Sequence, residues 1–506
     1  MKPCSGSATA ALSALLALTG APGCSWAEAA SGAPPDELAP APAATSTPTA
    51  PGASEQNSDI ELIPQGLRVA PSSPTTASSP APPATSATQR LYLENALTAE
   101  SLRGAGWVPL PPPPPFDWQE RVFFDARKHW DIGEGVDVRY SGRLNLRAEN
   151  DIDFPNHETV INDLREIYAS WQPLARSYLD LGRINLKSGV ALGYNPTDFF
   201  KTRAVVEPLS ADPTVLREDR LGTLMLRGQE VFDRGSLTAA VAPRLYSPSA
   251  IYTDLNLPSF DPSLDRTNAA NRLLLKGTAN FSANVSPELL YYREGGQSRV
   301  GANLTQNIGQ RSIAYLEWSG GTRPDLIEQA LLYARETGTL PASAPAVLPE
   351  NPHRSFQSEL ALGASYTGAA EVTVNFEYHF NQAAFTATDW SRWFTIGRGT
   401  TAASPVAGEL WYIRDYAADQ QQPINRHSLF LRADWTDALI PKLELSGFVD
   451  VDVHDGSSLL QLGADYYLSD HWTVGGLLIG YAGARRTDFG SLPIAATWLL
   501  DFARYL

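Results

Sequence analysis

Cysteine is almost absent from this chain of 506 residues. The two that it has, Cys4 and Cys24, both lie in the first 24 residues. A disulfide framework, a thiolate metal site and a cysteine nucleophile are therefore excluded from everything after Cys24. Beyond a short N-terminal stretch, no apolar run approaches the eighteen or so residues of a membrane-spanning helix. The formal net charge of −16 at pH 7 argues against nucleic-acid binding, which usually needs a basic face.

Signals of catalysis are also lacking. The seven histidines show no spacing typical of metal ligands, and no glycine-rich loop of the phosphate-binding kind is present. A lipase built on a barrel would need an outward-facing serine and histidine at the lipid boundary, and no such pair stands out. We therefore expect a protein that is not an enzyme, with no catalytic residue, no metal and no cofactor.

Many segments of the chain alternate between apolar and polar residues with a period of two. In the segment 136–149, small or apolar residues occupy one face, and charged or polar residues occupy the other. A soluble sandwich could show this pattern once or twice, whereas a series of such strands fits a barrel with lipid outside and water inside. The 12 Trp, 19 Tyr and 18 Phe residues could form a packed core, but we favour two interfacial girdles around a barrel.

About sixteen strand candidates follow residue 120. Their approximate ranges are 134–148, 163–172, 176–187, 219–230, 236–246, 271–281, 285–294, 297–308, 311–320, 355–367, 371–380, 426–436, 442–454, 457–468, 471–481 and 492–504. Short turns alternate with long loops, as in outer-membrane proteins. The sequence thus predicts an all-β fold, a closed antiparallel transmembrane β-barrel of about 16 strands (16–18), in the outer membrane of a Gram-negative bacterium. An even number of strands puts both termini in the periplasm.

The part before the barrel has a different composition. Residues 1–29 resemble a signal peptide that ends at Ala27-Glu28-Ala29, although a lipoprotein site at Cys24 is an alternative. Residues 30–117 are predicted to be a disordered periplasmic arm rich in Pro, Ala, Ser and Thr, with a short helix at Leu91–Leu102 and a proline spacer at 111–115. The arm could bind a periplasmic protein, but a plain tether is the simpler interpretation. The barrel is predicted to span 118–506.

The stretch from Tyr178 to Phe200, YLDLGRINLKSGVALGYNPTDFF, resembles Gram-negative porin-like barrels related to alginate-export proteins. The residues that carry the resemblance are Leu181-Gly182-Arg183 and Asn195-Pro196-Thr197-Asp198, together with the preceding strand from Leu164 to Tyr168. The resemblance covers about forty residues, and it implies a barrel that passes solutes or exports polysaccharide. The chain departs from it at Lys187-Ser188-Gly189 and at its C-terminal Leu506.

The alternation also predicts which side chains line the pore. Early strands supply mainly cations, with Ile184 and Leu186 toward lipid, and later strands supply carboxylates. The predicted pore-lining residues are Arg139, Arg143, Arg147, Glu166, Arg183, Asn185, Lys187, Glu377, Glu444, Asp450, Asp452 and Asp465. Opposed walls of charge would create a transverse field that filters solutes. The alternative is that these charges simply neutralise one another in a closed barrel.

Two loops carry further expectations. Loop 188–218 contains Asn195 and Asp198 and could fold inward to constrict the pore, with Thr197 or Asp198 capping a short helix. In loop 381–425, the aromatic residues Trp390, Trp393, Phe394 and Trp411 could stack on sugars or merely pack the loop.

The predicted function is a channel for passive passage of small polar or carbohydrate-like solutes. The alternatives are an exopolysaccharide export conduit of alginate type and a plugged structural or adhesive barrel. The expected partners are outer-membrane lipid and a small polar solute or a polysaccharide, with a periplasmic protein on the N-terminal arm as a further possibility. No nucleic acid is expected.

Overall fold

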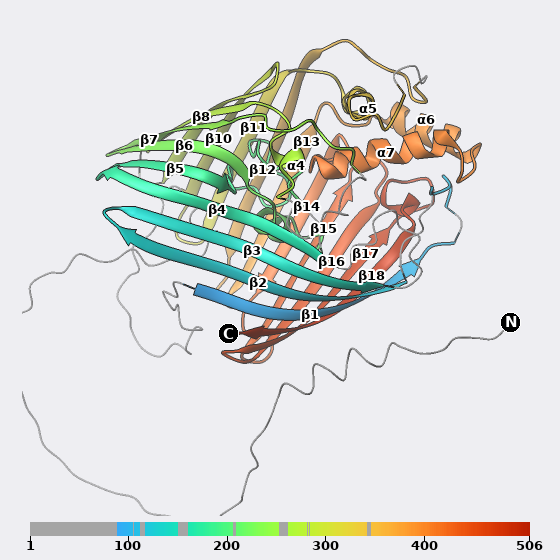
Figure 1. Ribbon diagram of the computed structural model, residues 1–506. Coiled ribbons are helices and arrows are strands. Elements are labelled where there is room, and N and C mark those ends of the chain that lie inside the picture. Colours follow the sequence, from blue (N-terminus) through green and yellow to red (C-terminus); the bar gives the residue numbers. More distant parts are fainter. Residues whose placement is uncertain are drawn as a thin grey trace, which may run out of the picture. The chain divides into compact units, whose positions relative to one another are not determined.

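Eighteen antiparallel strands form one closed sheet in the computed structural model, which describes residues 89–104, 106–111, 117–149, 160–205, 209–251, 262–280, 282, 284–341 and 346–506 (Figure 1). Each strand pairs with its successor in sequence, and β1 also pairs with β18, which closes the barrel. The strands are β1 (Gln89–Leu102), β2 (Trp118–Gly133), β3 (Val136–Glu149), β4 (Val160–Leu174), β5 (Ser177–Ile184), β6 (Thr223–Phe232), β7 (Gly235–Ala242), β8 (Arg272–Ala279), β9 (Val285–Glu294), β10 (Gln297–Ile308), β11 (Ser312–Arg323), β12 (Ser355–Thr367), β13 (Val372–Asn381), β14 (His427–Trp435), β15 (Leu443–Asp452), β16 (Ser458–Ser469), β17 (Trp472–Ala482) and β18 (Ile494–Tyr505).

All sixteen predicted strands are present, and the sequence prediction missed only β1 and β2. Residues 91–102 were expected to form a helix, but they belong to β1, and the barrel begins at Gln89 rather than at residue 118. The proline run 111–115 lies in the connection between β1 and β2 and therefore does not precede the barrel. The predicted signal peptide and the arm up to residue 88 fall outside the described residues.

The outer face of the barrel is apolar. Leu97, Leu181, Leu289 and Leu500 are all exposed, and each alternates along its strand with a residue that faces the other way. Only lipid can cover such a surface without cost, and a closed barrel leaves no unpaired strand edge in the membrane. This architecture confirms the predicted fold class and the predicted location in an outer membrane.

The helices in the described part of the chain lie in the long connections between strands. They are α3 (Pro213–Glu218), α4 (Leu264–Thr267), α5 (Leu326–Glu336), α6 (Ala387–Arg398), α7 (Pro405–Asp419) and the 3-10 turn η2 (Phe489–Ser491). None of the helices in the described part of the chain is long and apolar enough to cross a membrane. Helices α5, α6 and α7 gather at one end of the barrel (Figure 1).

The three helices pack around a cluster of tryptophan rings. Trp390, Trp393 and Trp411 are buried in this cluster, and the Arg414 guanidinium lies 5.2–5.3 Å from the centre of each ring. Arg414 also pairs with Asp488, 2.5 Å away. Because these rings are buried, the packing interpretation of the aromatic residues holds, and they do not form an exposed stacking platform.

Neighbouring positions on β18 test which face meets lipid. Leu500 points outward, whereas Asp501 lies on the opposite face beside Asp465. Replacing Leu500 with Arg is expected to lower the free energy of unfolding by about 2–4 kcal/mol, because a cation near the middle of the lipid face must leave water. Asp501→Arg should have a smaller effect. Unfolding of both variants in lipid vesicles measures the difference, and equal losses would show that the two faces are assigned wrongly.

Candidate functional site: a loop across the barrel

The connection between β5 and β6, residues 185–222, crosses the inside of the barrel. Thr197 Oγ1 donates to Asn303 Oδ1 on β10 (2.9 Å), and the Ala211 N–H donates to Gln461 Oε1 on β16 (2.8 Å). Asp219 lies 3.0 Å from Arg165 on β4. One segment can reach strands so far apart around a closed wall only through the lumen. These contacts agree with the predicted inward fold of loop 188–218, and a constriction of the pore by this loop stays a prediction. We call the described parts of the connection, 185–205 and 209–222, the crossing loop.

Two buried glutamates hold the first part of the crossing loop by its backbone. Glu317 on β11 accepts the N–H groups of Val190 and Ala191, and Glu377 on β13 accepts those of Leu192 (2.6 Å) and Gly193 (2.9 Å). Four consecutive N–H donors thus meet two carboxylates, and hydrogen bonds to charged acceptors are the strong kind.

The close approach of the loop to this wall depends on glycine. Gly189 has a φ of 79°, and a Cβ atom there would overlap the Glu317 carboxylate. At Gly193, a Cβ atom would lie 2.7 Å from both His379 and Phe430. The glycines therefore let the backbone approach the wall closely enough for its N–H groups to reach the carboxylates.

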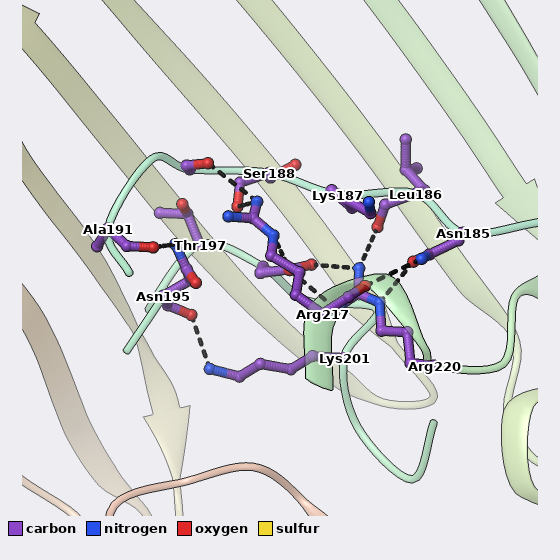
Figure 2. A network of polar contacts seen from close by, with 12 residues as sticks. Asn185, Leu186, Lys187, Ser188, Ala191, Asn195, Thr197, Lys201, Arg217 and Arg220 are labelled. Atoms are coloured by element: carbon purple, nitrogen blue, oxygen red, sulfur yellow. Dashed lines mark hydrogen bonds and ion pairs between the residues drawn. The ribbon is translucent and has the colours of Figure 1, made fainter. Parts of the chain in front are cut away.

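A second anchor lies within the crossing loop itself (Figure 2). Arg220 donates to both carboxylate oxygens of Asp198, at 2.9 and 3.1 Å, and to the Leu186 carbonyl at 2.9 Å. Arg217, at the end of α3, donates to the Ser188 and Gly189 carbonyls and lies 3.4 Å from Asp198. Burial alone would raise the pKa of Asp198, but Arg220 and Arg217 outweigh it and hold that pKa below its ordinary value.

Residues 197–200 form turns rather than the predicted short helix. Asp198 is committed to the two arginines, so it is not free to cap a helix. Asn195 donates to the Ala191 carbonyl (2.5 Å), and its own carbonyl accepts the Lys201 ammonium (2.7 Å), as Figure 2 shows. The polar side chains therefore cross-link the loop to itself.

Most of the predicted pore cations are neutralised by partners. Arg143 lies 3.2 Å from Asp125 and 3.0 Å from Asp219, and Arg147 lies 3.8 Å from Glu149. Lys187 pairs with Glu218. Arg139 is exposed on the same face of β3 as Arg143. On this wall, mutual neutralisation describes the structure better than an open row of positive charge.

The predicted third strand ends early. β5 stops at Ile184, so Asn185 and Lys187 belong to the crossing loop. Arg183 is buried and donates to the Gly222 and Pro262 carbonyls, whereas Glu166 on β4 accepts the Asn185 N–H at 2.8 Å.

The prediction that Ile184 and Leu186 face lipid was wrong. Both are buried against Phe199 and Phe200 of the crossing loop. Ile184 shares the inner face of β5 with the buried Asp180, because Leu179 and Leu181 at the alternate positions are exposed. The prediction had therefore assigned the end of this strand one residue out of register, and Leu186 lies beyond the end of β5, in the crossing loop.

Carboxylates that form no ion pair with a described residue collect on the part of the wall that leads through β1 and β2 to β3. Glu444 on β15 faces Asp465 on β16, and Gly475 on β17 separates Asp465 from Asp501 on β18 in the strand register. A Cβ atom on Gly475 would overlap both aspartates, so the glycine makes room for them. Within the described ranges, no ion pair involves these three carboxylates. Glu94 on β1 lies beside Asp501 and is also within electrostatic reach of Arg143. We call these four residues the anionic wall.

The other predicted carboxylates lie apart from the anionic wall. Glu377 is fully buried and accepts from His379 (2.7 Å) and Tyr315 (2.5 Å) as well as from the crossing loop. Asp450 lies beside Ser428, and the fully buried Asp452 accepts the His454 N–H at 2.8 Å. Glu377 therefore holds the crossing loop, while the place of Asp450 and Asp452 in the lining of the pore stays a prediction.

Several residues of the site escaped the sequence analysis. Glu317 could have been found, because alternation along 312–319 places it on the face opposite Leu316 and Trp318. Arg217 gave no signal, since a loop has no period to interpret. Asp219 and Arg220 were assigned to the predicted strand 219–230, but β6 begins at Thr223, so both belong to the crossing loop. Among the residues that the structure describes, no group of three or more His, Cys, Asp or Glu side chains could hold a metal ion.

Comparison with known proteins finds similarity only to solved structures, and not to a family model or a curated sequence. Among solved structures, it is similar to OccK8 (OprE) of Pseudomonas aeruginosa, with 10% identity, a TM-score of 0.47 and coverage of 83% of this chain and 97% of that one. It is also similar to OccAB1 of Acinetobacter baumannii, with 9% identity, a TM-score of 0.46 and coverage of 83% and 96%. A mutant of the Rh. blastica porin gives 11% identity, a TM-score of 0.35 and coverage of 83% and 99%.

Proposed function

We propose that this protein is an outer-membrane channel for passive passage of small polar solutes. The observation that carries the proposal is the anionic wall, a set of carboxylates inside the barrel that the fold does not neutralise. Barrels of this strand number leave an aqueous lumen. The crossing loop narrows that lumen, so the path suits small solutes rather than large ones.

The charge on the two walls sets the expected selectivity. The cations on β3 to β5 and the arginines of the crossing loop have acidic or carbonyl partners, whereas Asp465 on β16 and Asp501 on β18 form no ion pair with any described residue. Fixed charges in a confined pore are screened less than charges on an open surface. The current should therefore be carried mainly by cations, and neutral polar solutes should pass without an electrostatic barrier.

Recording from single channels in a planar bilayer tests the proposal. The wild type should conduct with a reversal potential that favours cations in a salt gradient. Asp465→Asn combined with Asp501→Asn should shift the reversal potential toward anions, most clearly at low salt, because two uncompensated charges are removed. The double variant removes two negative charges and leaves the size of both side chains unchanged.

Glu288→Gln combined with Lys276→Met is the matched control. Glu288 on β9 lies 3.8 Å from Lys276 and accepts from Asn303 (2.9 Å), so removing both charges of the pair leaves the net charge unchanged and should change selectivity little. If the double variant of Asp465 and Asp501 conducts with the reversal potential of the wild type, the anionic wall does not line the conducting path. Absence of any current would overturn the channel itself.

A plugged structural barrel is the second candidate. It is favoured by the contacts of the crossing loop with strands on opposite sides of the lumen, from Arg165 on β4 to Glu377 on β13. The bilayer recording decides between the two candidates. The same loop argues against polysaccharide export, because it divides the space that a polymer would need. Residues 30–88 as a binding arm for a periplasmic protein remain a prediction.

A further inference from the structure

A separate cavity of about 260 Å³ lies where β12 meets the helical connections. Gln357 on β12 lines it, together with Asp325 at the start of α5 and Asp389 in the first turn of α6. Asn351, which is exposed, also lines the cavity and places part of it at the surface. None of these residues takes part in the anchors of the crossing loop.

Two buried polar atoms of the cavity lining have no hydrogen-bond partner among the residues that the structure describes. Gln357 is 7% exposed; its amide nitrogen donates to Ser355 Oγ (2.7 Å), but its Oε1 has no donor. Arg426 donates through Nη2 to the Gln382 carbonyl (3.0 Å), but its Nε has no acceptor. An unpaired buried polar group costs roughly 1–3 kcal/mol, so such groups are normally satisfied. The cavity thus offers one free acceptor and one free donor.

The two carboxylates that line the cavity, Asp325 and Asp389, form capping hydrogen bonds at the starts of α5 and α6. Asp325 Oδ1 accepts the Glu328 N–H (3.0 Å), and Asp389 Oδ2 accepts both the N–H (2.9 Å) and the hydroxyl (2.6 Å) of Thr386. The partial positive charge at the starts of α5 and α6 offsets these carboxylates. Burial raises the pKa of Asp325 above its ordinary value, although the Glu328 N–H and Asn351 oppose the shift.

These features select against a charged occupant. A cation would lie near the Arg426 guanidinium and two helix N-termini, and an anion would lie near Asp325 and Asp389. A hydroxyl group both donates and accepts, so neighbouring hydroxyls can serve Gln357 Oε1 and Arg426 Nε together. Phe385 and Ile327, also in the lining, supply an apolar surface for the carbon skeleton.

We infer that this cavity binds a neutral, polyhydroxylated solute about the size of a monosaccharide. The inference deepens the proposed function by naming the class of solute. Its role in transport rests on the proposed channel. Binding itself does not require conduction, so the two can fail separately.

Titration calorimetry of the full-length protein in detergent, with D-glucose as the probe, tests the inference. Gln357→Leu removes the unpaired acceptor at similar volume and should weaken glucose binding by about tenfold, the equivalent of one hydrogen bond of about 1.4 kcal/mol. Heat-modifiable migration on a gel confirms that the variant is folded. Wild-type binding of glucose, with much weaker binding of propylammonium and acetate, is the supporting result.

Thr473→Val is the matched control. Thr473 on β17 is 6% exposed and its Oγ1 also lacks a partner, but it lies outside the cavity. This variant should bind glucose as the wild type does. Equal glucose binding by Gln357→Leu, or tighter binding of either charged probe, would overturn the inference, while bilayer conductance of the same preparations reports separately on the channel.

Discussion

Asp198→Asn is expected to lower the free energy of unfolding by about 3–5 kcal/mol, because it leaves buried arginines without their counter-charge. Asp198 is 2% exposed, Arg220 holds it with two hydrogen bonds, and Arg217 lies 3.4 Å away. The asparagine keeps the shape of the side chain, so the loss reports on charge rather than on volume. Unfolding in lipid vesicles at neutral pH measures it.

The sign of the pH dependence follows from the same ion pairs. The pKa of Asp198 is held low in the folded protein, so its contribution to stability is present above the unfolded pKa of about 3.9 and is lost as the pH falls through the folded value. The wild type and Asp198→Asn should therefore converge in stability in strong acid.

A triple variant serves as the control. Replacing Asp198 with Leu, and Arg217 and Arg220 with Met, removes all three charges together, and well-packed apolar side chains often replace a buried ion pair without loss. The triple variant should thus be more stable than Asp198→Asn. If Asp198→Asn alone is as stable as the wild type at neutral pH, the three charges are not buried together as described.

Glu317→Gln combined with Glu377→Gln is expected to make the channel current unsteady. Each glutamate accepts two consecutive backbone N–H groups of the crossing loop. The two bonds to Glu377 use different oxygens, of which a glutamine has only one, whereas both bonds to Glu317 use Oε1 and would lose the negative charge of their acceptor. Hydrogen bonds to charged groups contribute roughly 1.5–3 kcal/mol each. Weakening two of them should let the loop leave the wall often enough to show as steps between conductance levels.

Single-channel recording of the double variant measures the effect against a steady wild-type current. Glu444→Gln is the control, because Glu444 lies on the inner wall and accepts only from Tyr467 (2.9 Å), without touching the crossing loop. That variant should conduct steadily. A steady current in the double variant, at the wild-type level, would show that these two carboxylates do not fix the loop.

The sequence by itself determined the wall of the barrel. The two-residue period identified sixteen of the eighteen strands, and the alternation of short turns with long loops gave their antiparallel order. The period succeeds because each strand meets lipid on one face, which demands apolar residues at every second position. The strands β1 and β2 were missed because a proline run in the loop between them looked like a spacer that precedes a barrel.

Only the tertiary structure decided what fills the lumen. Ile184 lies on the inner face of β5 with Asp180 and packs inside the barrel, and Leu186 joins the same cluster because the chain leaves the wall after Ile184. Whether Arg143 or Asp465 is neutralised depends on which strands and loops the closed barrel places opposite them. Such partners lie far apart in the chain and leave no periodic signal, so the outer face can be predicted from the sequence, while the charge of the pore follows from the fold.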